Sequence, residues 1–360
     1  MPRTEFGRHL PTYTMNKQKN EKVLIVGPSW VGDMVMAQSL FISLKQQNPN
    51  SSISVIAPPW TRPLLDRMPE VDEGIDISIG HGELKWAERR AIGKSLRSSG
   101  FTSSIVLPNS LKSALIPYHA KIRNRTAWRG EWRNLLLTDC RALDKEAFPR
   151  MVDRFVGLAH PVSKNPPENI PRPRLSINHE NVDKVLERFR MSKGPRTVAV
   201  CPGAEFGKAK QWPVEHYGVV CAQLISEGWR VWVFGSTNDS PAAQNLLEFI
   251  PRASASEVND LTGKTSLAEA IDLMSVADAV ISNDSGLMHI GAALDKSIIA
   301  IYGSTSPEFT PPLADRVKLM FTDIECRPCF KRECPYGHLR CLKDLEPSRI
   351  LDAARGLIEP

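Results

Sequence analysis

The segment Ala279-Val-Ile-Ser-Asn-Asp-Ser-Gly-Leu-Met-His-Ile-Gly-Ala-Ala-Leu294 passes from one apolar run, through polar and small residues, to a second apolar pattern. The first run, Ala279 to Ile281, is too short for a helix, and the later apolar residues recur at helical spacing. This order predicts a strand, a tight loop and a helix. Ser285 or Asp284 is expected to cap the helix, and Gly286 would let a ligand approach the backbone. The free N–H groups of the first turn suit a phosphate, although an ordinary capped helix is the alternative.

The composition bounds the class of protein. The chain has 360 residues, of which 42% are hydrophobic and 24% charged, and single cores seldom exceed about 250 residues. Two domains are therefore expected, and no apolar run approaches the ~18 residues of a spanning helix. The net charge of +6 permits an anionic partner. Seven cysteines and the lack of a signal pattern predict a reducing cytoplasm, with residues 1–21 a disordered extension rather than a targeting signal.

Strands alternate with helices twice along the chain, which predicts an α/β protein with parallel sheets. Strands are expected at residues 22–27, 52–57, 102–107, 197–201, 230–234, 279–282 and 297–302, with helices between them. Five prolines among residues 161–173 exclude a helix or a central strand there. The predicted units are an N-terminal domain (22–160), a proline-rich linker (161–176) and a C-terminal domain (177–360), with a ligand cleft between the domains.

The first predicted strand ends in Gly27-Pro-Ser-Trp-Val-Gly-Asp33. Neither the G-x-G-x-x-G fingerprint nor a P-loop is present, which disfavours a nicotinamide cofactor or a P-loop nucleotide. Asp33 has two interpretations: it begins a helix, or it acts as a general base at the carboxyl end of the strand. A helix N-terminus lowers the pKa of an aspartate, so a base in this place would need burial to raise that pKa again.

A basic and aromatic segment, Lys121 to Arg133, holds five cationic side chains and two tryptophans. Arginine forks match phosphate and carboxylate oxygens, and Trp128 or Trp132 could stack on a sugar or lie at a membrane interface. The alternative is a solvated basic loop. No helix-turn-helix, zinc-finger or RNP pattern accompanies the segment, so nucleic acid is not the expected partner.

Three loops in the second half carry polar residues at predicted strand ends. The first contains Lys208 and Lys210, the second ends in Asp239, and the third is the Asn-Asp-Ser-Gly turn. Lysines beside a helix N-terminus suit a diphosphate, and Asp239 could accept ribose hydroxyls. Each residue also has an ordinary interpretation, since Asp239 could cap a helix and Lys208 could be solvated. Together they favour a nucleotide-diphosphate donor.

Six segments in register resemble the ADP-heptose:lipopolysaccharide heptosyltransferases, and three of them resemble the heptosyltransferase II branch. They are residues 27–33, 109–114, 125–130, 210–213, 283–289 and 326–335. The resemblance implies a GT-B fold, in which two Rossmann-like domains with parallel sheets face a central cleft. It also implies inverting transfer of heptose from ADP-heptose to the first heptose of the lipopolysaccharide inner core. The acceptor would be of the heptosyl-Kdo2-lipid A type, and the enzyme would contact the cytoplasmic face of the inner membrane peripherally.

The resemblance also assigns roles to residues. Asp33 would be the catalytic base, while Lys210 and the N–H groups of the first turn would stabilise the departing diphosphate without a metal ion or other cofactor. The expected donor-binding residues are Lys208, Asp239, Asp284, Ser285, Gly286, Leu287 and His289, and the expected acceptor-binding residues are Lys112, Arg123, Arg125 and Arg129. His289 could equally be an ordinary helix histidine. Related enzymes have hydroxyl residues before the donor-side lysine, where this chain has Glu205-Phe-Gly207.

Four late cysteines, Cys326, Cys329, Cys334 and Cys341, lie near His338. They are enough ligands for one zinc ion, but their spacing does not match paired C-x₂-C ribbons. A structural loop without metal is therefore expected.

Two other functions remain open from the residues. One is a nucleotide-sugar epimerase on a similar two-domain scaffold, which would release ADP without an acceptor. The other is a non-catalytic protein that binds an anionic glycolipid or nucleic acid through residues 123–133, in a strongly salt-dependent manner.

Overall fold

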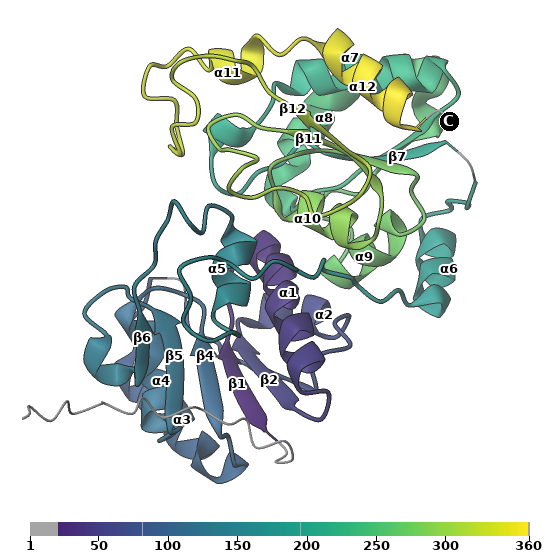
Figure 1. The fold of residues 1–360 in the computed structure, drawn as a ribbon. Helices are drawn as coiled ribbons and strands as arrows, with labels where there is room; N and C mark the ends of the chain where they lie inside the picture. The colour runs from purple at the N-terminus through teal and green to yellow at the C-terminus, as the bar shows by residue number, and fades with distance from the viewer. Residues whose placement is uncertain (1–20, 81, 195, 359–360) are drawn as a thin grey trace, which may run out of the picture.

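The computed structural model describes residues 21–80, 82–194 and 196–358. The prediction for residues 1–21 therefore falls almost entirely outside the described residues. Two six-stranded parallel sheets, each covered by helices, lie one above the other (Figure 1).

The lower sheet in Figure 1 belongs to the N-terminal half and has the strand order β3-β2-β1-β4-β5-β6. Its strands are β1 (Lys22–Val26), β2 (Ser52–Ala57), β3 (Glu73–Asp76), β4 (Ser103–Val106), β5 (Asn124–Trp128) and β6 (Asp139–Arg141). The helices are α1 (Val31–Gln47), α2 (Arg62–Leu65), α3 (Trp86–Ser95), α4 (Leu115–His119) and α5 (Met151–Gly157). β1 is apolar on both faces, since Val23 and Ile25 pack with α1 while Leu24 and Val26 pack with residues of α4. Continuous apolar strands of this kind are typical of a sheet covered on both sides.

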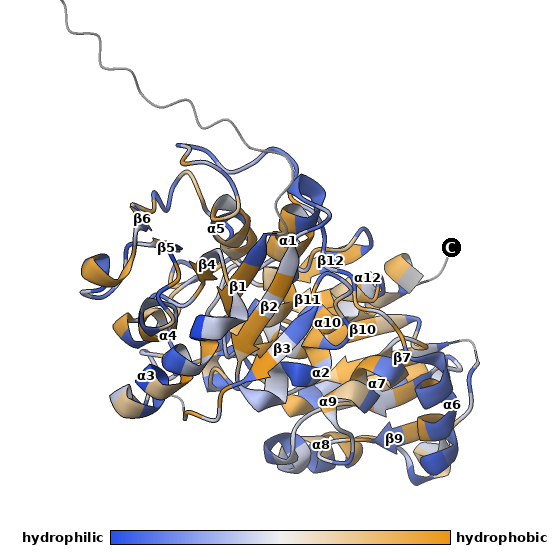
Figure 2. Ribbon diagram, turned by 90° about the horizontal axis from the view of Figure 1, so that it is seen from below, coloured by the Kyte–Doolittle hydropathy of each residue, from blue (hydrophilic) through white to orange (hydrophobic). Residues whose placement is uncertain are grey.

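The upper sheet has the order β12-β11-β10-β7-β8-β9. Its strands are β7 (Thr197–Cys201), β8 (Arg230–Val233), β9 (Val258–Asp260), β10 (Ala279–Asn283), β11 (Ser297–Ile301) and β12 (Val317–Met320). The helices are α6 (His179–Arg188), α7 (Val214–Ser226), α8 (Ser240–Leu247), α9 (Leu267–Met274), α10 (Gly286–Ala293), α11 (Arg340–Lys343) and α12 (Pro347–Ile358). Hydrophobic residues concentrate in the central strands, and hydrophilic ones on the outer helices (Figure 2).

The central strands lie where the sequence predicts them, and β2 and β7 have the predicted bounds. The prediction was wrong for the edge strands β3, β6, β9 and β12, which the sequence analysis did not include. Edge strands are short and polar, as Glu73–Asp76 illustrates, so they lack the apolar run that identifies a buried strand. The alternative interpretation of the basic and aromatic segment as a solvated loop is wrong for residues 124–128, because they pair with β4 and β6 as strand β5.

The two halves share a packed interface. α1 lies against α10 in the middle of the molecule, and one apolar core contains buried residues from both halves (Figure 1). Arg67, just after α2, donates to Asp272 of α9 at 2.6 Å, and both residues are buried. Residues 161–178 contain no helix or strand, and Leu175 among them donates its N–H to the carbonyl of Ala293. Within the described residues, no helix is long and apolar enough to cross a bilayer.

Candidate active site

The N-termini of α1 and α10 meet through two glycines. A Cβ added at Gly32 would lie 2.8 Å from Cδ2 of His289, and one added at Gly286 would lie 2.7 Å from Cγ1 of Val31. Real Cβ atoms do not approach other atoms this closely. Both glycines are therefore needed for the helix ends to approach, and the approach brings together loops from the two halves of the chain.

Asp33 lies in the first turn of α1, at this junction. Helix α1 begins at Val31, so Asp33 is inside the helix. Burial raises the pKa of Asp33 from 3.8 to about 6, Lys210 nearby lowers it, and Asp284 raises it. The burial that a base at a helix N-terminus requires is thus present, and it outweighs the cation.

Asp284 follows β10 and holds Lys210. The Nζ of Lys210 donates to Oδ2 of Asp284 at 2.7 Å and to its main-chain oxygen at 3.2 Å. The hydroxyl of Thr305 donates to the same Oδ2 at 2.7 Å, and that of Thr310 reaches Oδ1 at 3.4 Å. Because Asp284 is only 3% exposed, this ion pair fixes the lysine beside the ends of α1 and α10.

Thr305 and Thr310 were not predicted from the sequence. A signal for Thr305 was available, because the polar run Gly303-Ser-Thr-Ser306 directly follows a buried strand of the upper sheet. The carboxyl ends of parallel strands are where such sheets bind ligands.

The N-terminus of α10 carries no side-chain cap. Ser285 occupies the cap position, but its side chain makes no capping hydrogen bond, and its Oγ lies 3.1 Å from Oγ of Ser282. The carboxylate of Asp284 is bound by Lys210 and Thr305, so the expectation that either residue caps the helix was wrong. Gly286 and Leu287 follow in the first turn and are half-buried. An uncapped helix N-terminus beside a lysine is suited to bind an anion.

His289 is buried in α10 between these groups. Its Nε2 lies 4.0 Å from Oδ1 of Asp284, and its ring packs against Gly32. Burial lowers the pKa of His289 from 6.5 to about 4, Asp284 raises it and Lys210 lowers it, so the imidazole is neutral at pH 7. His289 therefore fills space and adds dipoles at the junction without adding charge.

The other two expected donor-binding residues, Asp239 and Lys208, differ in their contacts. Asp239 accepts hydrogen bonds from the N–H and hydroxyl of Ser236 within its own turn. It occupies the N-cap position of α8, but its side chain makes no capping hydrogen bond there, so the interpretation of Asp239 as a helix cap was wrong. Its Oδ1 also lies against Gly203, where an added Cβ would be 2.3 Å away. Lys208 is exposed. The ring of Phe206 lies 5.1 Å from Nζ of Lys210, so this aromatic residue supports the lysine by a cation–π contact.

The basic and aromatic segment splits into structural and exposed residues. Arg133 is fully buried and donates to the carbonyls of Trp128 and Ser110, among others, so it joins this segment to residues 108–113. Trp128 is 6% exposed and donates to the carbonyl of Arg154, which excludes it from stacking on a ligand. Trp132, by contrast, is 96% exposed.

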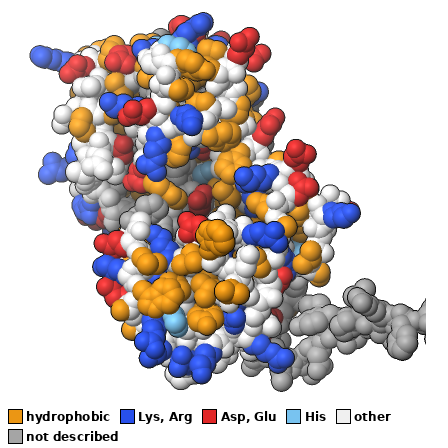
Figure 3. Space-filling view, turned by 90° about the vertical axis from the view of Figure 1, so that its left-hand side faces the viewer, with side chains coloured by type: hydrophobic (Ala, Val, Ile, Leu, Met, Phe, Trp, Pro, Cys, Tyr) orange, Lys and Arg blue, Asp and Glu red, His pale blue; other side chains and the backbone are white. Residues whose placement is uncertain are grey.

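The four expected acceptor-side cations also differ. Arg125 donates to the backbone carbonyls of Leu136 and Ile122, so part of its guanidinium is occupied by the fold. Arg123 and Arg129 are exposed, and Lys112 is half-buried. Figure 3 shows hydrophobic side chains gathered on the lower half, with cationic ones around them and a hollow above, toward the upper half.

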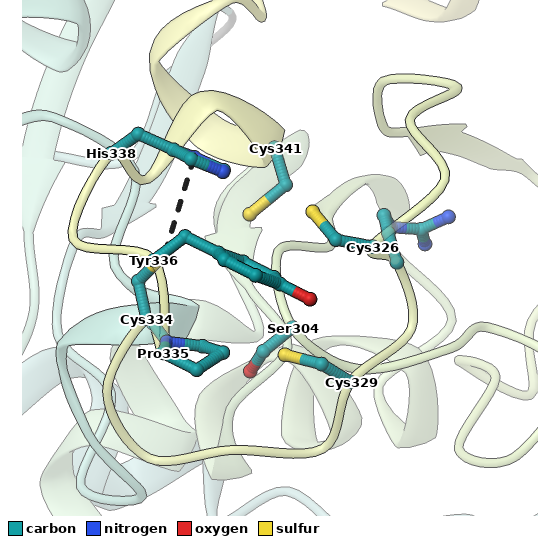
Figure 4. Close-up of a pocket in the computed structure, with 10 residues that line it drawn as sticks. Ser304, Cys326, Cys329, Cys334, Pro335, Tyr336, His338 and Cys341 are labelled. Carbon is teal, nitrogen blue, oxygen red and sulfur yellow. Dashed lines mark hydrogen bonds between the residues drawn. The ribbon is translucent and has the colours of Figure 1, made fainter.

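The four late cysteines surround one small hollow, together with His338 (Figure 4). Within the described residues, no three His, Cys, Asp or Glu side chains already stand at the spacing of metal ligands.

Comparison with known proteins identifies the family. The sequence model of "Glycosyltransferase family 9 (heptosyltransferase)" matches residues 89–340. The chain is 43% identical to lipopolysaccharide heptosyltransferase 2 of Salmonella typhimurium, over 94% of this chain and 98% of that protein. This chain belongs to glycosyltransferase family 9. It is 42% identical to the Escherichia coli lipopolysaccharide heptosyltransferase 2, over the same shares. The solved structure of E. coli ADP-heptose lps heptosyltransferase II superposes with a TM-score of 0.84 at 40% identity, over 94% of this chain and 98% of that one. The family membership and the two parallel sheets confirm the predicted GT-B type of α/β fold and the predicted glycosyltransferase class.

Proposed function

We propose that this family 9 enzyme transfers L-glycero-D-manno-heptose from ADP-heptose to the first heptose of the lipopolysaccharide inner core. The relatives named above are heptosyltransferases of lipopolysaccharide synthesis, and they cover nearly the whole chain. The observation that carries the proposal is the meeting of Asp33, whose pKa is raised to about 6, with Lys210 and an uncapped helix N-terminus. A base, a cation and an anion-binding helix end are the groups that transfer from a nucleotide diphosphate requires.

The base acts on the acceptor. Asp33 accepts the proton of an acceptor hydroxyl while that oxygen forms a bond to the anomeric carbon of the donor sugar. The bond from that carbon to the diphosphate oxygen breaks, and ADP leaves with the electron pair. Because attack and departure take place on opposite faces, the anomeric configuration is inverted.

The leaving group is stabilised on the C-terminal half. Lys210 and the N–H groups of residues 285–287 would bind the diphosphate, and the helix dipole of α10 favours its growing negative charge. Asp284 and Thr305 act as positioning residues, since they hold the lysine ammonium beside the helix end. Lys208 would add a second cation, and Asp239 would contact the ribose with the oxygen that faces Gly203. This arrangement requires neither a metal ion nor another cofactor for the transfer.

The acceptor would bind on the N-terminal half. Lys112, Arg123, Arg125 and Arg129 would contact its phosphates and acidic sugars, although Arg125 has fewer free N–H groups than the others. Trp132 would lie against a sugar face or among lipid headgroups. An acceptor of the heptosyl-Kdo2-lipid A type is embedded in a membrane, so we propose that the enzyme binds peripherally at the cytoplasmic face of the inner membrane.

The test measures ADP release from ADP-heptose, with and without an inner-core acceptor that carries a single heptose. The parent is compared with Asp33→Ala and with Asp66→Ala, which removes an exposed carboxylate at the end of α2. Acceptor-dependent release should fall at least ~10²-fold in the first variant and stay unchanged in the second.

Each other outcome favours a different function. Release without an acceptor would indicate an epimerase or hydrolase. Full activity of Asp33→Ala would show that this carboxylate only begins a helix. Strongly salt-dependent binding of glycolipid with no ADP release in the parent would indicate a non-catalytic binding protein.

A further inference from the structure

The hollow beside the donor loops is lined by thiols that the transfer reaction does not use. Cys326, Cys329 and Cys334 lie on the loop that follows β12, and Cys341 lies on α11. All seven cysteines of the chain are free thiols. Figure 4 shows that the four late cysteines, three on the loop and one on α11, border the same space as His338.

The backbone after Cys334 turns so that an N–H group points back at the sulfur of this cysteine. The chain turns through Pro335-Tyr-Gly-His338, with Gly337 in the left-handed region at φ +71°. Its end brings the N–H of Leu339 to 3.5 Å from Sγ of Cys334. N–H groups that point at a cysteine sulfur orient and stabilise a thiolate ligand, as hydrogen bonds around metal sites do.

A buried hydroxyl at the hollow gives a second, independent indication. Ser304 lines the hollow and is 1% exposed, and among the described residues none forms a hydrogen bond with its Oγ. Buried hydroxyls normally have a partner. In Figure 4 this Oγ lies on the side of the hollow where Cys329 stands, so a thiolate there would accept its proton in a hydrogen bond.

We propose that Cys326, Cys329, Cys334 and Cys341 together bind one soft transition-metal ion, zinc or a single iron. Four thiolates in tetrahedral arrangement select these metals. The expectation of a metal-free loop rested on the sequence spacing, which cannot show that Cys341 returns to the first three thiols. Because no three of these side chains stand at coordinating spacing, metal binding requires the thiols to change rotamer within the hollow.

The ion would stabilise the loop that carries Lys210. Phe330 of the cysteine loop donates its N–H to the main-chain carbonyl of Ser304 at 2.7 Å. Ala209 donates its N–H to the main-chain carbonyl of Arg332 at 3.0 Å. The guanidinium of Arg332 also lies over the ring of Phe206, 5.4 Å from its centre. A metal ion that fixes the cysteine loop would therefore fix the turn that ends at Lys210. This consequence rests on the proposed function, whereas metal binding itself does not.

The experiment measures metal content by mass spectrometry of the full chain, purified without a histidine tag under reducing, anaerobic conditions. About one zinc or iron per chain is expected for a single site. Cys326→Ser and Cys334→Ser should each lower that content at least ~10-fold. Cys140→Ser is the matched control, because Cys140 lies in the other half of the molecule and donates to Asn134. Reconstitution of the parent with cobalt should give the intense thiolate-to-cobalt bands of a tetrahedral site.

Three results would overturn the proposal. The first is a parent that binds no zinc, iron or cobalt, and the second is full metal content in both cysteine variants. The third is a metal-free parent in which mass spectrometry shows the late cysteines joined as disulfides. If the variants do not fold, the cobalt spectrum of the parent decides by itself. Activity is read separately, so failure of the transferase proposal would leave the metal result intact.

Discussion

Acidification should inactivate this enzyme through Asp33. The pKa of this carboxyl is raised by burial to about 6, and a general base must be ionised to accept a proton. The kcat/KM of the transfer reports the pKa of the free enzyme, so its acid limb should have a midpoint near that value. The variant Asp33→Asn removes the titrating group and should remove the limb with it.

The size of the effect follows from the ionised fraction. With a pKa of about 6, roughly 90% of the molecules carry an ionised Asp33 at pH 7 and roughly 10% at pH 5, so kcat/KM should fall about tenfold. An aspartate at the ordinary value of 3.8 would still be roughly 90% ionised at pH 5. At pH 5 the raised pKa therefore predicts about a tenfold loss of kcat/KM, whereas the ordinary pKa predicts almost none.

The assay follows initial rates of acceptor-dependent ADP release between pH 4.5 and about 8, at substrate concentrations well below KM. Because phosphate monoesters on the acceptor also titrate near pH 6, the residual activity of Asp33→Asn is the control. A parent whose kcat/KM stays nearly constant down to about pH 4.5 would refute the role of burial. A limb near pH 6 that persists in Asp33→Asn would assign it to another group.

Three further predictions follow. Asp33→Asn should stabilise the protein above pH 6 but not below pH 4, because the folded state with the higher pKa loses stability as the carboxyl ionises. The rise from 3.8 to about 6 corresponds to at most about 3 kcal/mol, to be measured by urea unfolding at both pH values, and equal effects at both would contradict it. Lys210→Met should slow turnover about 10²-fold. It should also move the acid limb above pH 6, since Lys210 lowers the pKa of Asp33. A limb that stays at the same pH would contradict this electrostatic coupling between Lys210 and Asp33. Gly32→Ala should destabilise the chain and reduce activity because its Cβ would lie 2.8 Å from His289, as thermal melting would show, whereas Gly356→Ala meets nothing within 4 Å and should be neutral or slightly stabilising.

Local patterns in the chain were sufficient for most of the fold. β1, β7 and β10 are apolar runs that only a covered parallel sheet accommodates, and the alternation with helices specifies the α/β class. The edge strands could not be predicted from an apolar pattern, because they form by pairing with a neighbouring strand rather than through their own apolar content.

The site residues show the same division. Asp33, Asp284 and the pair Lys208 and Lys210 could be named in advance, because polar residues that follow buried parallel strands collect at one edge of a sheet. The choice of Lys210 over Lys208 rested on the resemblance to the heptosyltransferases. Their identities did not reveal that Asp284 binds the lysine, nor that Arg133 is buried among carbonyls instead of facing a ligand. Both outcomes depend on atoms supplied by distant segments.

The amino-acid order therefore specifies the elements, the two halves and the polar residues at the strand ends, because these depend on short-range spacing of side chains. Tertiary packing alone sets the ionisation of Asp33 and His289 and the free N-terminus of α10. Burial, charge neighbours and the contact of Gly32 with His289 join residues far apart in the chain. Such long-range contacts determine pKa values and helix ends, and no local pattern encodes them.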